Sequence, residues 1–78
     1  MDFELKVRKI LAESCGWGLA SVQLDTRLVE DLDMDSMELV EFSLRLEDEF
    51  DISVPDGTIA ATMTVGDVVE VVKKLRGA

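Results

Sequence analysis

The residues with the clearest potential for chemistry surround Ser36, in the run DLDMDSME at positions 31–38. A serine acts as a nucleophile only beside a base, usually a histidine, and the chain contains no histidine. The neighbouring carboxylates also disfavour negative charge on the serine oxygen. We therefore expect Ser36 to be modified by another protein, and we do not expect the chain to be an enzyme.

The same acidic run has a second interpretation, as a calcium-binding loop. Asp31, Asp33 and Asp35 have the spacing that opens an EF-hand loop. Such a loop needs Gly at its sixth position and Glu at its twelfth, and this chain has Ser36 and Phe42 there. A dedicated metal site is therefore not expected, although weak binding of divalent ions by the acidic cluster stays open.

Negative charge is concentrated in one part of the chain. The 78 residues include 17 acidic and 8 basic ones, for a net charge of −9. The segment from Glu30 to Asp51 holds ten acids and one base, Arg45, so it accounts for the whole imbalance. Such a field repels phosphate backbones, which excludes nucleic acid as a partner, and it attracts proteins with basic patches. An acidic interaction module with no prosthetic group remains an alternative.

The hydrophobic pattern predicts three helices that must position these groups. The first begins near Phe3 and stops at the glycines on either side of Trp17. The second covers residues 36–50, because Asp35 and Glu38 form an N-terminal capping signature. The third begins after Thr64 and carries a stripe of valines. We therefore predict an all-α fold, a small bundle of three main helices, that uses residues 1–78 as a single domain.

Two connections join the predicted helices. The first is long for so small a domain, and we expect it to be ordered by apolar anchors. The anchors expected there are Leu19, Val22, Leu24, Leu28, Val29 and Leu32. Trp17 is a further candidate anchor for this loop. Residues 56–63 give a weak signal for one additional short helix, because Gly57 and the nearby threonines disfavour it.

The cellular compartment follows from what the sequence lacks. No apolar run approaches the roughly 20 residues that a membrane span needs, and the first residues lack the pattern of a secretory signal. The one cysteine, Cys15, forms no intrachain disulfide, and we expect it to be a small apolar filler. These features predict a cytoplasmic protein in a reducing compartment, and we separately expect it to be a monomer.

The central helix carries two apolar stripes. At about 100° per residue, Leu39, Phe42, Leu46 and Phe50 fall within about 80° of one another and should face the core. Nearly opposite lie Met37, Val40 and Leu44. This second stripe is either core or an exposed ridge for a partner with an apolar groove bordered by Arg and Lys. The acids interleaved with it favour the ridge.

Together these features resemble the acyl carrier protein family, whose hallmark is an Asp-Ser-Leu motif at the start of its second helix. Here the motif reads Asp35-Ser36-Met37, and the resemblance extends over nearly the whole chain. It includes LVEDL at 28–32, LEDEF at 46–50, VPD at 54–56 and TV at 64–65. Asp33 stands where the family normally has a glycine. If this position needs a positive φ, Asp is one of the few other residues that tolerate that conformation. Ser43 stands where an apolar residue is common.

The resemblance implies a function for Ser36. A phosphopantetheinyl transferase would move 4'-phosphopantetheine from coenzyme A onto this serine, and the thiol of the arm would carry acyl groups as thioesters. The partners implied are acyl-transferring, condensing or ligating enzymes of fatty-acid, polyketide or related biosynthesis, with basic docking patches. The family also shelters the acyl chain in an apolar cleft among its helices. The partner-binding residues it implies are Asp35, Met37, Val40, Glu41, Leu44, Glu47 and Asp48.

An aminoacyl or peptidyl carrier with the same arm is the closest alternative to this function. Peptidyl carriers typically have Gly-Gly before the serine, and this chain has Met34-Asp35. The strong acidity also favours an acyl carrier.

Overall fold

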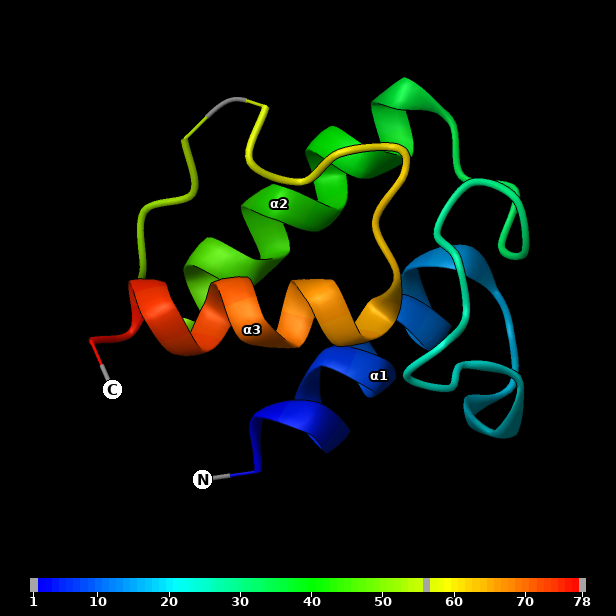
Figure 1. Cartoon of the computed structure of the whole chain (residues 1–78), viewed down its shortest axis with the longest axis horizontal. Helices are drawn as coiled ribbons and strands as arrows, with labels where there is room; N and C mark the ends of the chain where they lie inside the picture. Colours follow the sequence, from blue (N-terminus) through cyan, green and yellow to red (C-terminus); the bar gives the residue numbers. More distant parts are fainter. Residues whose placement is uncertain (1, 56, 78) are drawn as a thin grey trace.

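Three α-helices with long connections between them make up the fold (Figure 1). The computed structural model describes residues 2–55 and 57–77. Helix α1 spans Phe3–Cys15, α2 spans Ser36–Phe50 and α3 spans Val65–Leu75, while a short 3₁₀ turn, η1, covers Leu19–Ser21. The prediction of three main helices is confirmed. In the described residues no helix is long and apolar enough to cross a membrane.

The helix ends follow the capping signals of the sequence. Gly16 ends α1 in the left-handed conformation, with φ of 73°, which a glycine adopts without steric cost. Asp35 and Glu38 form a reciprocal capping box at the start of α2, and Thr64 and Asp67 form another at the start of α3. Local sequence therefore fixes where each helix begins.

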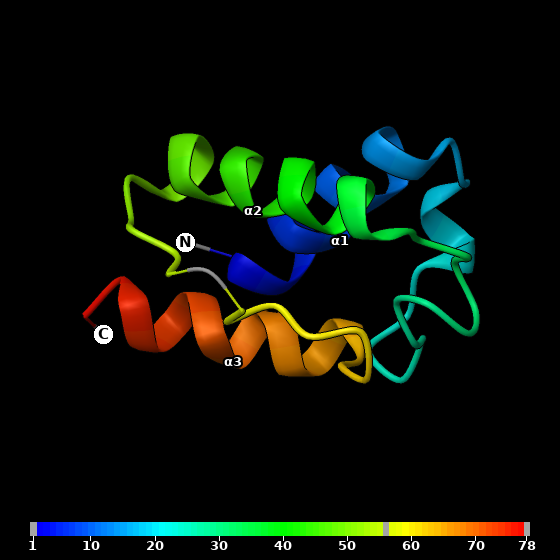
Figure 2. The same cartoon turned by 90° about the horizontal axis from the view of Figure 1, so that it is seen from above.

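Helix α1 packs against both α2 and α3, and in the view of Figure 2 part of it is seen between them. The stripe predicted for α2 faces inward, because Phe42, Leu46 and Phe50 are at most 1% exposed and Leu39 packs partly buried against the core. The ring of Phe3 lies 5.6 Å from that of Phe50, centroid to centroid. The valine stripe of α3 completes the core from the other side, with Val65, Val68, Val69 and Val72 buried.

The first connection is ordered by fewer side-chain anchors than the sequence predicted. Val22, Leu28 and Leu32 are buried as expected, but Leu19 and Leu24 are exposed, so those two expectations were wrong. Both residues are held through their backbone carbonyls instead. The Leu19 carbonyl accepts from the guanidinium of Arg8, and the Leu24 carbonyl accepts from the Gly66 N–H at 2.8 Å. Backbone bonds of this kind leave no hydrophobic pattern in the sequence.

Trp17 and a strand-like contact also order the connections. The indole N–H of Trp17 donates to the Leu32 carbonyl at 3.3 Å, which confirms Trp17 as an anchor of the loop. Arg27 and Thr64 form an isolated antiparallel bridge, and the Leu28 N–H donates to the Met63 carbonyl at 3.1 Å. The two connections therefore support each other beside the start of α3.

The second connection, residues 51–64, contains turns but no helix among the residues that the structure describes. The Thr58 N–H donates to the Pro55 carbonyl, and the Met63 N–H to the Ala60 carbonyl, each at 3.1 Å. The weak prediction of a short helix over 56–63 therefore fails for residues 57–63, and residue 56 lies outside the described residues. Gly57, with φ of 82°, favours a turn over a continued helix.

Candidate functional site

Ser36 is the first residue of α2, and its side chain is exposed. The capping box fixes this position. The Glu38 N–H donates to Asp35 Oδ1 at 2.8 Å, and the Asp35 N–H donates to Glu38 Oε1 at 3.1 Å. A group attached to the Ser36 oxygen would lie at the N-terminal end of a helix, where the helix dipole favours negative charge. Because Ser36 is exposed, an approaching enzyme can reach its hydroxyl.

The turn that leads into α2 depends on Asp33. This residue has φ of 56°, in the left-handed region, which confirms that the position needs the conformation for which glycine is usual. The Asp33 N–H donates to the Val29 carbonyl at 3.0 Å, and the Met34 N–H to the Leu28 carbonyl at 3.2 Å. Because Met34 is buried next to this turn, the chain reaches Ser36 along one defined path.

Asp31 stabilises the same loop and faces a basic neighbour. Its Oδ2 accepts from the Arg27 N–H at 2.7 Å and lies 3.5 Å from the guanidinium of Arg27. The backbone hydrogen bond from Arg27, aided by its positive charge, lowers the pKa of the Asp31 carboxyl. Within residues 2–55 and 57–77, no group of three or more His, Cys, Asp or Glu residues could hold a metal ion. Asp31 thus has a role in the loop itself.

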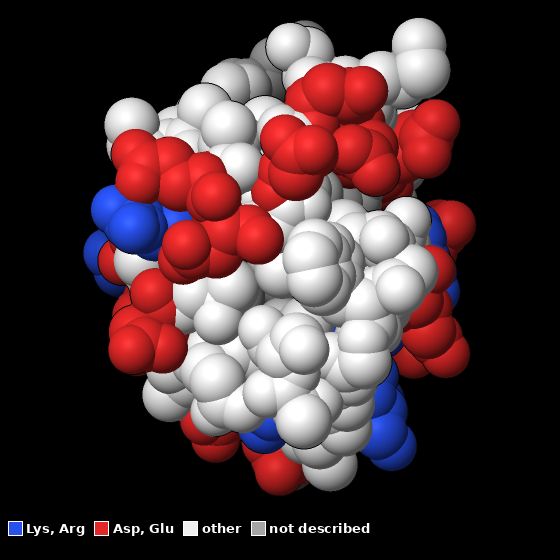
Figure 3. All heavy atoms as spheres, turned by 90° about the vertical axis from the view of Figure 1, so that its right-hand side faces the viewer, with Lys and Arg blue, Asp and Glu red and all other residues white. Residues whose placement is uncertain are grey.

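The second apolar stripe of α2 is exposed, as the sequence favoured. Met37, Val40 and Leu44 are 70%, 60% and 56% exposed. Glu41 and Asp48 are also exposed, as is Asp35. Figure 3, which views the end of the molecule where α2 begins, shows acidic side chains in patches beside a broad uncharged surface. The alternative, that this stripe is a second core face, is wrong.

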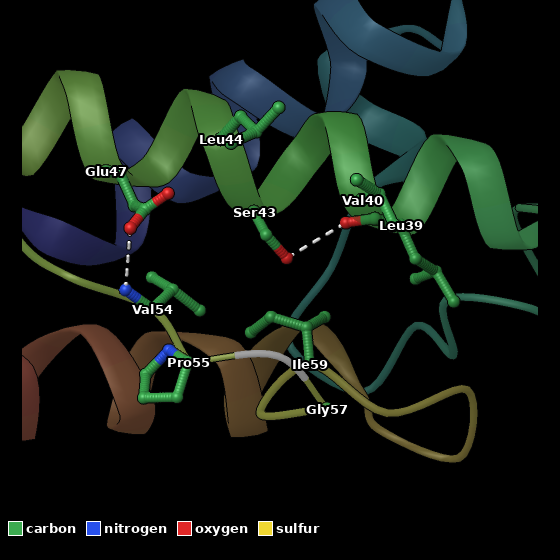
Figure 4. Close-up of a pocket in the computed structure, with 9 residues that line it drawn as sticks. All are labelled: Leu39, Val40, Ser43, Leu44, Glu47, Val54, Pro55, Gly57 and Ile59. Carbon is green, nitrogen blue, oxygen red and sulfur yellow. Dashed lines mark hydrogen bonds between the residues drawn. The ribbon is translucent and has the colours of Figure 1, made fainter.

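Glu47 differs from the other acids of this group because it is half-buried. Its Oε2 accepts a hydrogen bond of 3.0 Å from the Val54 N–H, which fastens the second connection to α2 (Figure 4). Sequence reasoning missed this role. No local signal could have revealed it, because the bond depends on how the chain returns toward α2 after the helix ends at Phe50.

A cleft separates α2 from part of the second connection, residues 54, 55, 57 and 59 (Figure 4). Ser43 and Glu47 project into this space from α2. The Ser43 hydroxyl donates to the Leu39 carbonyl at 2.9 Å. An apolar cleft was implied by the family resemblance, but this cleft also has polar groups. Its lining residues are Leu39, Val40, Ser43, Leu44, Glu47, Val54, Pro55, Gly57 and Ile59.

Comparison with known proteins identifies the family. The family model described as "Phosphopantetheine attachment site" matches residues 5–72. The chain belongs to this family. It is 38% identical over 73 residues to the acyl carrier protein of Clostridium acetobutylicum, covering 94% of each chain. It is 39% identical over 72 residues to that of Lactobacillus acidophilus, covering 92% of this chain and 90% of the relative. The acyl carrier protein of Akkermansia muciniphila is 38% identical over 76 residues, covering 97% and 95%.

Family membership decides between the functional alternatives. The chain is an acyl carrier, not an enzyme, and its cofactor is covalent 4'-phosphopantetheine. The alternative of an interaction module without a prosthetic group is therefore set aside. Membership also implies contact with a phosphopantetheinyl transferase and with biosynthetic enzymes.

Proposed function

We propose that Ser36 is the residue that carries 4'-phosphopantetheine. The observation that supports this most directly is the exposed Ser36 side chain at the first position of α2. The described residues fit the group, because the N-terminal end of α2 favours the negative charge of a phosphodiester. The neighbouring carboxylates oppose that charge, but they lie in solvent, where such interactions are weak.

The attachment requires chemistry that this chain does not supply. The Ser36 oxygen forms a bond to the phosphorus that bears the pantetheine arm of coenzyme A, and the nucleotide portion leaves. The serine proton passes to a base of the transferase, since the chain has no histidine. When bound, the arm supplies a thiol that holds acyl groups as thioesters. The contribution of α2 is to present the hydroxyl at a fixed place.

The surface that partners recognise is, in our proposal, the outer face of α2. The exposed apolar side chains supply area that is removed from water on binding, and the acids around them speed encounter with basic patches. A carrier that visits several enzymes needs rapid binding and release, which a small interface with electrostatic steering provides. The residues of this docking surface are Asp35, Met37, Val40, Glu41, Leu44, Glu47 and Asp48.

We also propose that the chain acts as a single domain and a monomer, in the cytoplasm. Burial raises the pKa of the Cys15 thiol, and the nearby Glu38 carboxylate raises it further. The thiol of Cys15 is therefore a poor nucleophile, which fits the role of a filler in a reducing compartment. The partners of the carrier are, in our proposal, acyl-transferring, condensing or ligating enzymes of fatty-acid, polyketide or related biosynthesis.

Mass spectrometry tests the attachment residue. The purified chain is incubated with coenzyme A, Mg²⁺ and a phosphopantetheinyl transferase. We expect the mass of one phosphopantetheine to be added, and none to be added to Ser36→Ala. Ser53→Ala is the matched control, because Ser53 is also exposed but lies in the second connection, and it should be loaded normally. Loading of Ser36→Ala, or loss of loading in Ser53→Ala alone, would contradict the proposal.

A further inference from the structure

The two polar side chains that line the cleft of α2 and the second connection, Ser43 and Glu47, are both acceptors toward a guest. The only hydrogen of the Ser43 hydroxyl is donated to the Leu39 carbonyl, which leaves the lone pairs of Oγ available. The Glu47 carboxylate accepts one hydrogen bond, from Val54, and has further acceptor positions. The other side chains that line the cleft are apolar. Among the lining residues that the structure describes, no side chain therefore offers a free donor.

These acceptors lie along the same face of α2 as Ser36. Seven residues separate Ser36 from Ser43, which is about 10 Å of helix and about 20° short of two full turns. Glu47 follows one turn later, about 20° to the other side of that line. An arm attached to Ser36 that runs along this face would bring its far end to the cleft. Figure 4 shows both side chains directed from α2 toward the segment that forms the opposite wall.

We propose that, because of Ser43, the cleft of this carrier binds acyl groups with a hydroxyl group more tightly than saturated or oxo-substituted groups of the same length. The proposal rests on attachment of the arm at Ser36. A hydroxyl can donate to Ser43 Oγ or to the Glu47 carboxylate. A ketone finds no side-chain donor, so its oxygen would lose hydrogen bonds to water on entry. A saturated chain removes water from the lone pairs of Ser43 Oγ and offers them no donor, although the hydroxyl keeps its bond to Leu39.

A matched set of thioesters tests this selectivity. The transferase is supplied with butyryl-, 3-hydroxybutyryl- or 3-oxobutyryl-coenzyme A, so that each acyl group is loaded together with the arm. The rate of thioester cleavage by hydroxylamine is then measured and divided by that of the same acyl group on free pantetheine. One hydrogen bond changes an equilibrium constant roughly fivefold. We therefore expect the normalised cleavage rate of the 3-hydroxybutyryl form to be about fivefold lower than that of the other two. The backbone amide signals of Ser43 and Val54 should shift most for this form.

Ser43→Thr and Ser43→Val form the control pair, because the two side chains have nearly the same shape and differ in the hydroxyl. Protection of the 3-hydroxybutyryl group should persist in Ser43→Thr and disappear in Ser43→Val. Equal protection of all three acyl groups, or persistence in Ser43→Val, would overturn the proposal.

The carrier with the arm alone is the second control. If the backbone amide signal of Ser43 in the carrier with the arm alone is already shifted as far as in the 3-hydroxybutyryl form, the arm's own amides occupy the site and the proposal is wrong. Failure of loading is visible by mass beforehand, and it contradicts attachment at Ser36 instead.

Discussion

The two faces of α2 have similar hydrophobic residues and opposite environments. Phe42 and Leu46 are fully buried against α1, whereas Met37, Val40 and Leu44 are more than half exposed on the same helix. Hydrophobicity alone therefore does not decide burial; the position of the neighbouring helix does. The inner face stabilises the fold, and the outer face leaves apolar area exposed, which we propose a partner covers.

The sharpest test of this comparison uses two leucines that lie two residues apart. Leu46→Ala removes a fully buried side chain, and we expect it to lower the free energy of unfolding by about 2–5 kcal/mol. Leu44→Ala truncates a side chain that is 56% exposed, and we expect a change within about 0.5 kcal/mol. Urea unfolding monitored by circular dichroism measures both.

The same pair separates stability from recognition. Leu44→Ala should reduce kcat/KM for loading by the transferase several-fold, which corresponds to about 1 kcal/mol, although its fold is intact. Equal destabilisation by the two substitutions would show that the outer face is part of the core. Unchanged loading of Leu44→Ala would remove this residue from the docking surface.

The division between the two faces could be predicted from the sequence because it depends on local periodicity. The spacing of Phe42, Leu46 and Phe50 gives the inner face, and the Asp35–Glu38 capping pair gives the register of the helix. The position of Ser36 follows from the same local signals. These local signals locate both stripes, and the acids interleaved with Met37, Val40 and Leu44 favour the outer one as the exposed stripe.

The features that the sequence did not reveal all depend on contacts between distant segments. The Arg8 guanidinium holds carbonyls of Leu19 and Val22 in the first connection, and Glu47 holds the N–H of Val54 in the second. In both cases the acceptor or donor on the connection is a backbone group, which any residue type provides. The polar character of the cleft was also missed, because Ser43 faces a cleft only once residues 54, 55, 57 and 59 have formed the opposite wall.

Charge on the outer face should affect encounter more than stability. We expect Glu41→Lys combined with Asp48→Lys to lower kcat/KM for loading several-fold at low salt, because the steering of a basic partner is reversed. The effect should fade in 1 M salt, where the screening length falls to about 3 Å. Initial rates at several salt concentrations measure this.

The matched control for charge is Asp25→Lys combined with Glu70→Lys. Both residues are exposed and lie outside α2, and the change in net charge is the same. If this control slows loading as much as the changes at Glu41 and Asp48, the partner responds to net charge and the outer face has no special role.

Glu47 lies at the boundary between the two faces, and substitutions there should affect both stability and loading modestly. Glu47→Ala loses the acceptor for the Val54 N–H, and we expect a loss of about 1 kcal/mol in the free energy of unfolding. Glu47→Gln keeps an acceptor oxygen, so its loss should be smaller, and removal of one charge should lower kcat/KM for loading by no more than about twofold. Urea unfolding and initial loading rates measure the two effects. If Glu47→Gln slows loading as strongly as the double change at Glu41 and Asp48, Glu47 acts chiefly in docking. If Glu47→Ala leaves stability unchanged, its bond to Val54 does not help to hold the second connection against α2.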